Sequence, residues 1–192
     1  MRSFTTSIET ALQKDVLTDS MIFPKAKIST TRFTLDSIRD EDFGSLMSIF
    51  KSERVSKNYM VPELKTPENE TKLFATLKGL SLSQDRYVYG IFLDDKLIGL
   101  IHDTDIDGDR IEIGYALHPD YFGFGYMTEA FSALIEHLFS VGFNEVVAGA
   151  FSDNVASIRV MQKCGMLKQE NTEEIQYRGK SHTCIFYSIK KK

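Results

Sequence analysis

Two glycines between a predicted strand and a predicted helix give this sequence its clearest chemical signal. Gly123 and Gly125 lie in an aromatic turn, and residues 127–139 after it place apolar side chains three and four positions apart. That spacing puts the apolar side chains on one face of a helix. A helix N-terminus offers unpaired N–H groups and the positive end of a dipole, and glycine lets a ligand approach them closely. The residue types therefore predict an anion site, most simply one for phosphate.

Two common phosphate loops do not fit these glycines. A nucleoside-triphosphate loop continues from its last glycine with Lys and then Ser or Thr, whereas Tyr126 follows Gly125. The dinucleotide fingerprint has a third glycine where this sequence has Thr128. The turn alone leaves two interpretations open, a loop for another phosphate ligand and a plain tight turn.

A carboxylate in the preceding strand is the second chemical candidate. In residues 110–117 large apolar side chains alternate with Glu112, Gly114 and Ala116, so Glu112 shares a strand face with two small residues. Acidic side chains are seldom buried unless they are paired or functional. Glu112 is therefore our candidate general base, and a structural or substrate-positioning carboxylate is the alternative.

The whole segment is more specific than its glycines. Residues 111–131, IEIGYALHPDYFGFGYMTEAF, resemble motif A of the GNAT acetyltransferase superfamily, especially its branch of ribosomal-protein N-terminal acetyltransferases (RimJ/RimL-like). In the family's loop, Gln/Arg-x-x-Gly-x-Gly/Ala, Phe122 takes the first place, Gly125 matches the central glycine and Met127 replaces the small last residue. The resemblance implies that backbone amides hold the diphosphate of acetyl-CoA, in a loop slightly widened by Met127. The cofactor-binding residues that it implies are Leu117, Phe122, Gly123, Phe124, Gly125, Tyr126, Met127 and Thr128.

A second match follows at the family's spacing. Residues 153–166 resemble the pattern Asn-x-x-Ser-x-x-(apolar)-x-x-Lys-x-Gly-Phe and predict a capped helix that ends at Gly165. The resemblance implies that Asn154 holds the pantetheine arm, Ser157 gives a proton to the leaving thiolate, and Lys163 reaches a cofactor phosphate. A pure helix cap, a hydroxyl bonded to the backbone and a solvated lysine are the respective alternatives.

The order of predicted elements gives an α+β fold. Three early strands precede a strand–helix–strand–helix core and a closing hairpin. The resemblance covers about residues 27–190 and implies a GNAT-like fold, whose mixed central sheet is flanked by helices and splays open between the strands ending near Leu117 and Phe151. We expect a single N-acetyltransferase domain in residues 23–192. Residues 1–22 form an N-terminal extension whose periodicity allows a short helix, packed on the domain or on a second subunit of a homodimer.

The implied reaction is direct transfer of the acetyl group from acetyl-CoA to a primary amine. The amine must be neutral to attack, and a backbone N–H near Leu117 would stabilise the oxyanion. At neutral pH about one lysine amine in 2,500 is neutral, against roughly one α-amine in ten. We therefore expect the α-amine of a protein N-terminus or a small-molecule amine as acceptor.

His182 is a secondary acid–base candidate, because the acid that this branch often has near Thr183 is missing. The alternative function is a non-catalytic acyl-CoA-binding or regulatory module on the same fold.

Composition excludes several other classes of protein. The 192 residues carry a formal net charge of -4 and no dense basic stripe, so we expect no nucleic-acid partner. No apolar run approaches the roughly 20 residues of a membrane span, and no signal core is present, so a membrane partner is not expected. Cys164 and Cys184 form neither a disulfide framework nor a metal set, which favours a cytoplasmic protein. Residues 103–109 resemble the start of a calcium loop, but Gly114 stands where a bidentate Glu is needed, so an acidic hairpin turn is favoured and no metal is expected.

Overall fold

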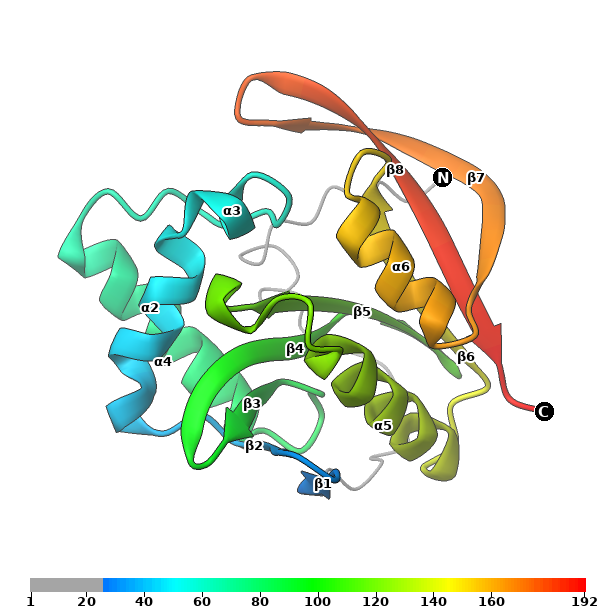
Figure 1. The fold of residues 1–192 in the computed structure, drawn as a ribbon, viewed down its shortest axis with the longest axis horizontal. Coiled ribbons are helices and arrows are strands. Elements are labelled where there is room, and N and C mark those ends of the chain that lie inside the picture. Colours follow the sequence, from blue (N-terminus) through cyan, green and yellow to red (C-terminus); the bar gives the residue numbers. More distant parts are fainter. Residues whose placement is uncertain (1–25) are drawn as a thin grey trace.

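A mixed eight-stranded sheet is the centre of the fold (Figure 1). The structure is a computed structural model and describes residues 26–192. The strands lie in the order β1-β2-β3-β4-β5-β6-β8-β7, and every neighbouring pair is antiparallel except β5 and β6. Their bounds are β1 Ile28–Ser29, β2 Thr34–Asp36, β3 Tyr89–Leu93, β4 Lys96–Asp107, β5 Arg110–Leu117, β6 Glu145–Phe151, β7 Leu167–Tyr177 and β8 Lys180–Lys190.

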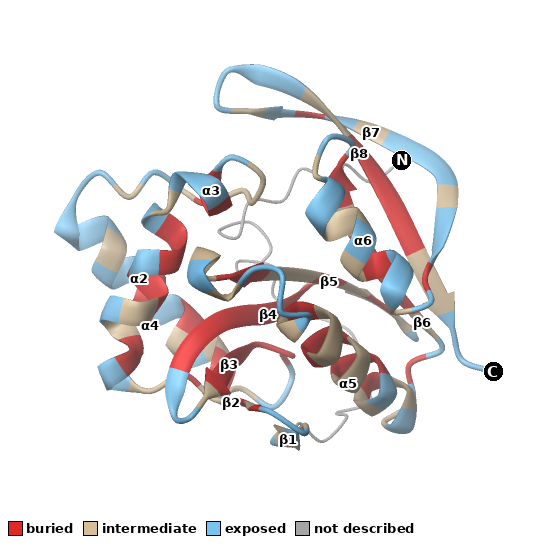
Figure 2. Cartoon of the chain, viewed as in Figure 1, coloured by how far each residue is buried: buried red, intermediate tan, exposed pale blue. Residues whose placement is uncertain are grey.

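Helices cover both faces of the sheet. Leu100 of β4 packs with α2 and α4, and the next residue, Ile101, packs with α5, as expected from the alternation of a strand. Figure 2 shows the buried residues of each helix on the side that faces the sheet. The helices are α2 Phe43–Lys51, α3 Glu53–Ser56, α4 Pro67–Leu82, α5 Tyr126–Ser140 and α6 Val155–Lys163, with single 3-10 turns at Asp40–Asp42 and Pro119–Tyr121.

The sheet opens between its two parallel strands. β5 and β6 pair only where Arg110, Ile111 and Glu112 face Glu145, Val146 and Val147. Beyond Glu112 the strands diverge, and their far ends at Leu117 and Phe151 have no register with each other. The helix α5 makes the crossover that a parallel pair requires. The predicted α+β fold with a splayed mixed sheet is therefore confirmed.

Most predicted elements are present, with small differences in their bounds. The closing hairpin turns at Arg178 and Gly179, both with positive φ, and the acidic segment turns between Asp107 and Arg110 as the predicted hairpin. Among the early strands, β2 has only three residues, and the two-residue β1 pairs with it. The helix allowed in residues 1–22 lies outside the described residues. In residues 26–192 no helix combines the length and apolar character needed to cross a membrane.

Candidate active site

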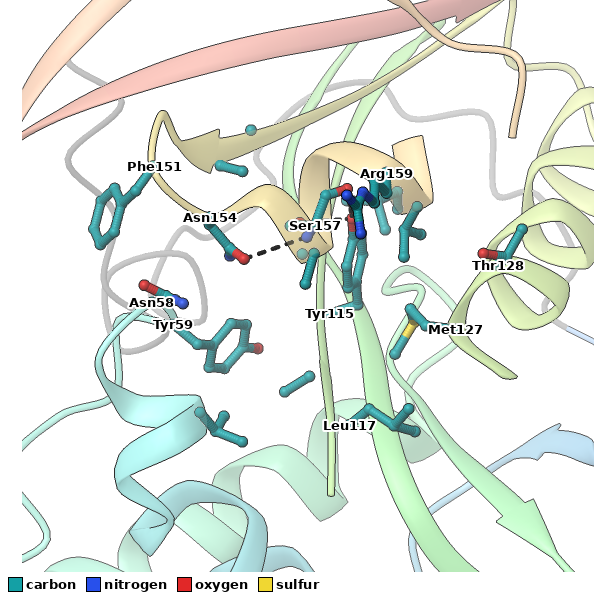
Figure 3. A pocket seen from close by; sticks show the side chains of 18 of the residues that line it. Asn58, Tyr59, Tyr115, Leu117, Met127, Thr128, Phe151, Asn154, Ser157 and Arg159 are labelled. Atoms are coloured by element: carbon teal, nitrogen blue, oxygen red, sulfur yellow. Dashed lines mark hydrogen bonds between the residues drawn. The ribbon is translucent and has the colours of Figure 1, made fainter. Parts of the chain in front are cut away.

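The splay between β5 and β6 opens into a cleft of about 540 Å³ (Figure 3). One end of the cleft is lined by the loop that leads into α5 and by α6. The other end is lined by the segment after α3, which includes Tyr59 and Met60. Every candidate catalytic or cofactor-binding residue from the sequence lines this cleft except Phe124 and His182. The Phe124 side chain is 60% exposed and stacks on Tyr126, while His182 stacks on Phe151 with ring centroids 4.3 Å apart.

The glycine loop presents a row of unengaged N–H groups. Gly123 and Gly125 adopt φ values of 87° and 76°, which non-glycine residues rarely adopt, and Gly125 is the residue that caps α5. The backbone N–H groups of residues 123–128 donate to no group within the described part of the chain. They lie at the positive end of the α5 dipole. The loop can therefore hold an anionic group through its backbone alone.

An arginine from the N-terminal part of the chain holds this loop in place. Arg32 Nε lies 2.7 Å from Glu129 Oε2, Arg32 Nη1 donates to the Phe124 carbonyl at 3.0 Å, and the guanidinium covers the Tyr126 ring. The Met127 side chain is buried and packs in the apolar cluster of α5. Sequence reasoning missed Arg32, because nothing in its own neighbourhood signals a partner 97 residues away.

The open edge of β5 supplies further donors. His118 N–H donates to the Ile98 carbonyl at 2.8 Å, and the register pairs Leu117 with Gly99. Because successive strand N–H groups point to opposite sides, the N–H groups of Leu117 and Tyr115 point away from β4, towards the splay. In that direction β6 offers no partner beyond Val147. The predicted oxyanion donor near Leu117 is thus directed into the cleft.

The first turn of α6 combines a helix cap with a pair of hydroxyl groups. Asn154 Oδ1 accepts a hydrogen bond from the Ser157 N–H at 3.2 Å, so the capping alternative for Asn154 is present (Figure 3). The Ser157 hydroxyl lies 2.7 Å from the Tyr115 hydroxyl, which also donates to the Ser157 carbonyl at 3.2 Å. Burial raises the pKa of Tyr115, and its hydrogen bond to Ser157 only partly offsets this. At neutral pH both hydroxyl groups therefore keep their protons.

Two cations on α6 line the cleft. Lys163 and Arg159 are four residues apart and lie on one side of the helix. Both are exposed, and neither forms an ion pair with any residue between 26 and 192. Arg159 was not among the predicted site residues, although its spacing from Lys163 was a usable signal.

Glu112 lies where the pairing of β5 and β6 ends. Its Oε1 accepts a hydrogen bond from the Thr104 hydroxyl at 3.1 Å, and its buried Oε2 has no hydrogen-bond partner in the described chain. Arg110 Nη2 is 4.0 Å from that Oε2. Burial raises the pKa of Glu112, and the bond from Thr104 and the charge of Arg110 oppose this shift. Glu112 is thus a carboxylate that accepts a proton more readily than an exposed one.

A second polar contact, which was not predicted, lies at the end of the cleft lined by the segment after α3; we call this the acceptor end. The Tyr59 hydroxyl lies 2.5 Å from His102 Nε2, and both residues line the cleft. Tyr177 from the closing hairpin donates to the carbonyls of Ser56 at 2.6 Å and Tyr59 at 3.2 Å. The segment that carries Tyr59 is therefore held over the cleft from two sides.

Comparisons with known proteins agree with this geometry. Residues 32–167 match the sequence model of the acetyltransferase (GNAT) domain. The uncharacterized N-acetyltransferase YoaA of Bacillus subtilis is 28% identical over 170 residues, which cover 85% of this chain and 96% of that protein.

Two solved structures show the same fold. A putative ribosomal-protein-serine acetyltransferase from Vibrio cholerae superposes with a TM-score of 0.73 at 19% identity, over 88% of this chain and 99% of that chain. The microcin C7 self-immunity acetyltransferase MccE, solved with acetyl-CoA and AMP, superposes with a TM-score of 0.73 at 20% identity, over 84% of this chain and 93% of that chain. With its splayed sheet, its open amide loop and a family match over most of its length, this chain belongs to the GNAT acetyltransferase family and is an N-acetyltransferase that uses acetyl-CoA.

Proposed function

We propose that the acceptor of this enzyme is a primary amine of low pKa, the α-amine of a protein N-terminus or of a small molecule. The main support for acetyl-CoA binding is the row of N–H groups in residues 123–128 that have no partner in the described chain, because such a row suits a diphosphate. The open edge of β5 lies next to it and suits the amide groups of the pantetheine arm. Asn154 and Lys163 flank the same path from α6.

The proposed reaction is a direct transfer, without an acetyl-cysteine intermediate. Burial raises the pKa of Cys184 to about 12 and also raises that of Cys164, so neither thiol supplies a thiolate at neutral pH. Glu112 accepts a proton from the bound ammonium, and the neutral amine attacks the thioester carbonyl. The Leu117 N–H stabilises the oxyanion. As the C–S bond breaks, the hydroxyl pair of Ser157 and Tyr115 gives a proton to the sulfur.

The acceptor class follows from the environment of the base. Glu112 and Asp105 both line the cleft, and carboxylates there attract a cationic ammonium group. A carboxylate is a weak base for a lysine amine, whose pKa is near 10.4, but a better match for an α-amine near 8. A putative ribosomal-protein-serine acetyltransferase shares the fold, which supports a protein N-terminus as acceptor, and a small molecule with an α-amine meets the same requirement.

Calorimetry and a thiol-release assay test this proposal. We expect acetyl-CoA to bind, and thiol release to be faster with a short peptide bearing a free N-terminal serine, or with free serine, than with Nα-acetyl-lysine. A chain that binds acetyl-CoA but releases thiol with none of these amines would contradict the proposed acceptor class. The same would hold if Nα-acetyl-lysine were the best acceptor.

The non-catalytic alternative makes a different prediction in the same assay. Two departures of this sequence from the family pattern favour it, Met127 in the loop and the missing acid near Thr183. Because the Met127 side chain is buried in the core, it leaves the loop N–H groups uncovered. Acetyl-CoA binding with no turnover on any amine would favour that alternative.

A further inference from the structure

The contact between Tyr59 and His102 joins the cleft to a fully buried imidazole. His102 is 1% exposed, whereas the Tyr59 ring is half-buried and lines the acceptor end. The distance between Tyr59 Oη and His102 Nε2 is 2.5 Å. A molecule in the cleft can therefore exchange a proton with His102 through the Tyr59 hydroxyl.

The hydrogen bonds of His102 fix which ring nitrogen can accept a proton. His102 Nδ1 lies 2.9 Å from the Asp103 carbonyl oxygen, which can only accept, so Nδ1 carries the hydrogen. In the neutral ring the lone pair is then on Nε2, and the Tyr59 hydroxyl donates to it. The pair is thus arranged as donor Tyr59 and acceptor His102.

The surroundings keep this imidazole neutral. Burial lowers the pKa of His102, and Arg86 lowers it further, while the hydrogen bond to the Asp103 carbonyl and the Asp103 carboxylate oppose this shift. That carboxylate is itself engaged, because Arg86 Nε lies 2.6 Å from Asp103 Oδ2. Tyr59, the remaining ionisable contact, has its pKa raised by burial and stays protonated. His102 therefore stands ready to accept a proton at neutral pH.

Gly114 places the pair beside Glu112. A Cβ atom on Gly114 would lie 3.1 Å from His102 Nε2 and 3.1 Å from Thr104 Cγ2, so the two side chains flank the same spot on β5. Thr104 is also the residue that donates to Glu112 Oε1. Two proton acceptors thus lie along one strip of the cleft floor, with Gly114 and Thr104 between them.

Acetylation of an ammonium group requires two protons to leave the nitrogen. Glu112 takes the first proton in the proposed function, on which this inference rests. We propose that the Tyr59–His102 pair takes the second: Tyr59 Oη accepts the proton of the tetrahedral intermediate's nitrogen while its own proton moves to His102 Nε2. The C–S bond then breaks, and the thiolate takes a proton from the hydroxyl pair of Ser157 and Tyr115. When product leaves, one of the two protons held by Glu112 and His102 returns to the hydroxyl pair, and the other goes to solvent. Every group then has the protons with which it started.

A buried imidazole suits the second step better than the first. The nitrogen of the tetrahedral intermediate is attached to a carbon that bears oxygen and sulfur, so it is more acidic than an ordinary ammonium. A weak base then suffices, whereas the first proton is drawn by a charged carboxylate. Tyr59 touches the substrate and is the catalytic residue of the pair, and His102 is a positioning residue that stores the proton.

The substitution Tyr59→Phe tests the catalytic part. It removes the hydroxyl but keeps the ring, which stacks on Phe50 at 6.0 Å with an interplanar angle of 3°. We expect kcat to fall about 100-fold and the Kd of acetyl-CoA to change less than about twofold, since general acid–base groups contribute roughly 100- to 10,000-fold. The control Tyr187→Phe removes the hydroxyl of a core tyrosine that does not line the cleft and should leave kcat unchanged.

The acceptor for this experiment is the serine-ended peptide, or the amine that the wild type turns over fastest. A kcat for Tyr59→Phe within about threefold of the wild type would overturn the inference, because an acid–base group contributes far more. Failure of the proposed function is distinguishable, since it shows in the wild type itself, which would then turn over none of these amines or would prefer Nα-acetyl-lysine.

The protonation of His102 tests the positioning part without any acceptor. In ¹⁵N NMR of the imidazole side chains at neutral pH, we expect His102 to be neutral with its hydrogen on Nδ1, and its Nε2 signal to move in Tyr59→Phe. A charged His102, or a hydrogen on Nε2, would overturn the inference.

Discussion

The Tyr115 hydroxyl lies 2.7 Å from the Ser157 hydroxyl, and this contact joins β5 to α6 across the open side of the sheet. Ser157 alone was predicted as the acid for the leaving thiolate. The structure gives it a partner, Tyr115, that also lines the cleft. The proton donor is therefore a pair of hydroxyl groups, and its members can be tested separately.

We expect Tyr115→Phe to lower kcat more than Ser157→Ala. In Ser157→Ala the Tyr115 hydroxyl keeps the Ser157 carbonyl, 3.2 Å away, as its partner, so one donor remains beside the sulfur. We expect a loss of about tenfold for Ser157→Ala and about 100-fold for Tyr115→Phe, within the range for general acids. Steady-state kinetics with saturating acceptor give both values.

A matched serine controls this comparison. Ser140→Ala removes a hydroxyl at the far end of α5 that donates to the His137 carbonyl, and its kcat should equal that of the wild type. Equal kcat values for Ser157→Ala, Tyr115→Phe and Ser140→Ala would remove both residues from the acid step.

Gly125→Ala should weaken acetyl-CoA binding. Gly125 has φ of 76°, and a side chain at such an angle costs about 1–2 kcal/mol, which the loop can relieve only by turning its N–H groups away from the anion. We expect the Kd of acetyl-CoA, measured by calorimetry, to rise about tenfold or more, in line with that cost. The control is Gly79→Ala in α4, where a Cβ would meet nothing within 4 Å.

The two glycine variants should move stability in opposite directions. Gly79→Ala replaces a helical glycine and should stabilise the fold by about 0.5–1 kcal/mol, with no change in the Kd of acetyl-CoA. An unchanged Kd in Gly125→Ala would show that the loop amides do not hold the cofactor.

Glu112→Gln should stabilise the protein while it reduces activity. Burial raises the pKa of Glu112, so the folded state disfavours the carboxylate, and the neutral amide relieves this at neutral pH. As pH falls through the raised pKa towards the ordinary value near 4.5, Glu112 becomes protonated and the difference in stability between the two proteins disappears. Thermal unfolding at several pH values should therefore show a higher Tm for the variant only at the upper end.

The kinetic part of the same variant checks the role of Glu112 as a base. We expect kcat to fall at least about tenfold, with little change in the Kd of acetyl-CoA, as for loss of a general base. A lower Tm for Glu112→Gln at neutral pH would contradict the electrostatic account. A wild-type kcat at every pH would contradict the proposed base.

The parts of the site that depend on short stretches could be predicted from the sequence. Gly125 caps α5 with a positive φ, and Asn154 caps α6, because capping is decided by residues three or four positions apart. The alternation of β5 likewise placed Glu112 and Gly114 on one face. These signals are local, so one sequence suffices to find them.

The parts that depend on distant partners could not be predicted. Tyr59 and His102 are 43 positions apart, and their contact depends on how the segment after α3 folds over β4. Thr104 reaches Glu112 because the register of β4 shifts between Asp103 and Asp105, an irregularity that the residue pattern does not reveal. The two contacts that most affect the proposed chemistry therefore required the structure.

The last prediction concerns the charge on α6. Arg159 and Lys163 line the cleft as exposed cations, so they can face a phosphate of the cofactor without a competing carboxylate in the described chain. Arg159→Gln and Lys163→Gln should each raise the Kd of CoA about two- to fivefold at low salt, the range for exposed ion pairs, and less at high salt. The exposed Lys72 in α4 lies outside the cleft, so Lys72→Gln is the control and should leave the Kd unchanged.

Repeating the titrations with 3′-dephospho-CoA identifies the phosphate involved: a variant that loses affinity for CoA but not for the dephosphorylated form contacts the 3′-phosphate. If neither variant differs from Lys72→Gln at low salt, these cations do not contact the cofactor.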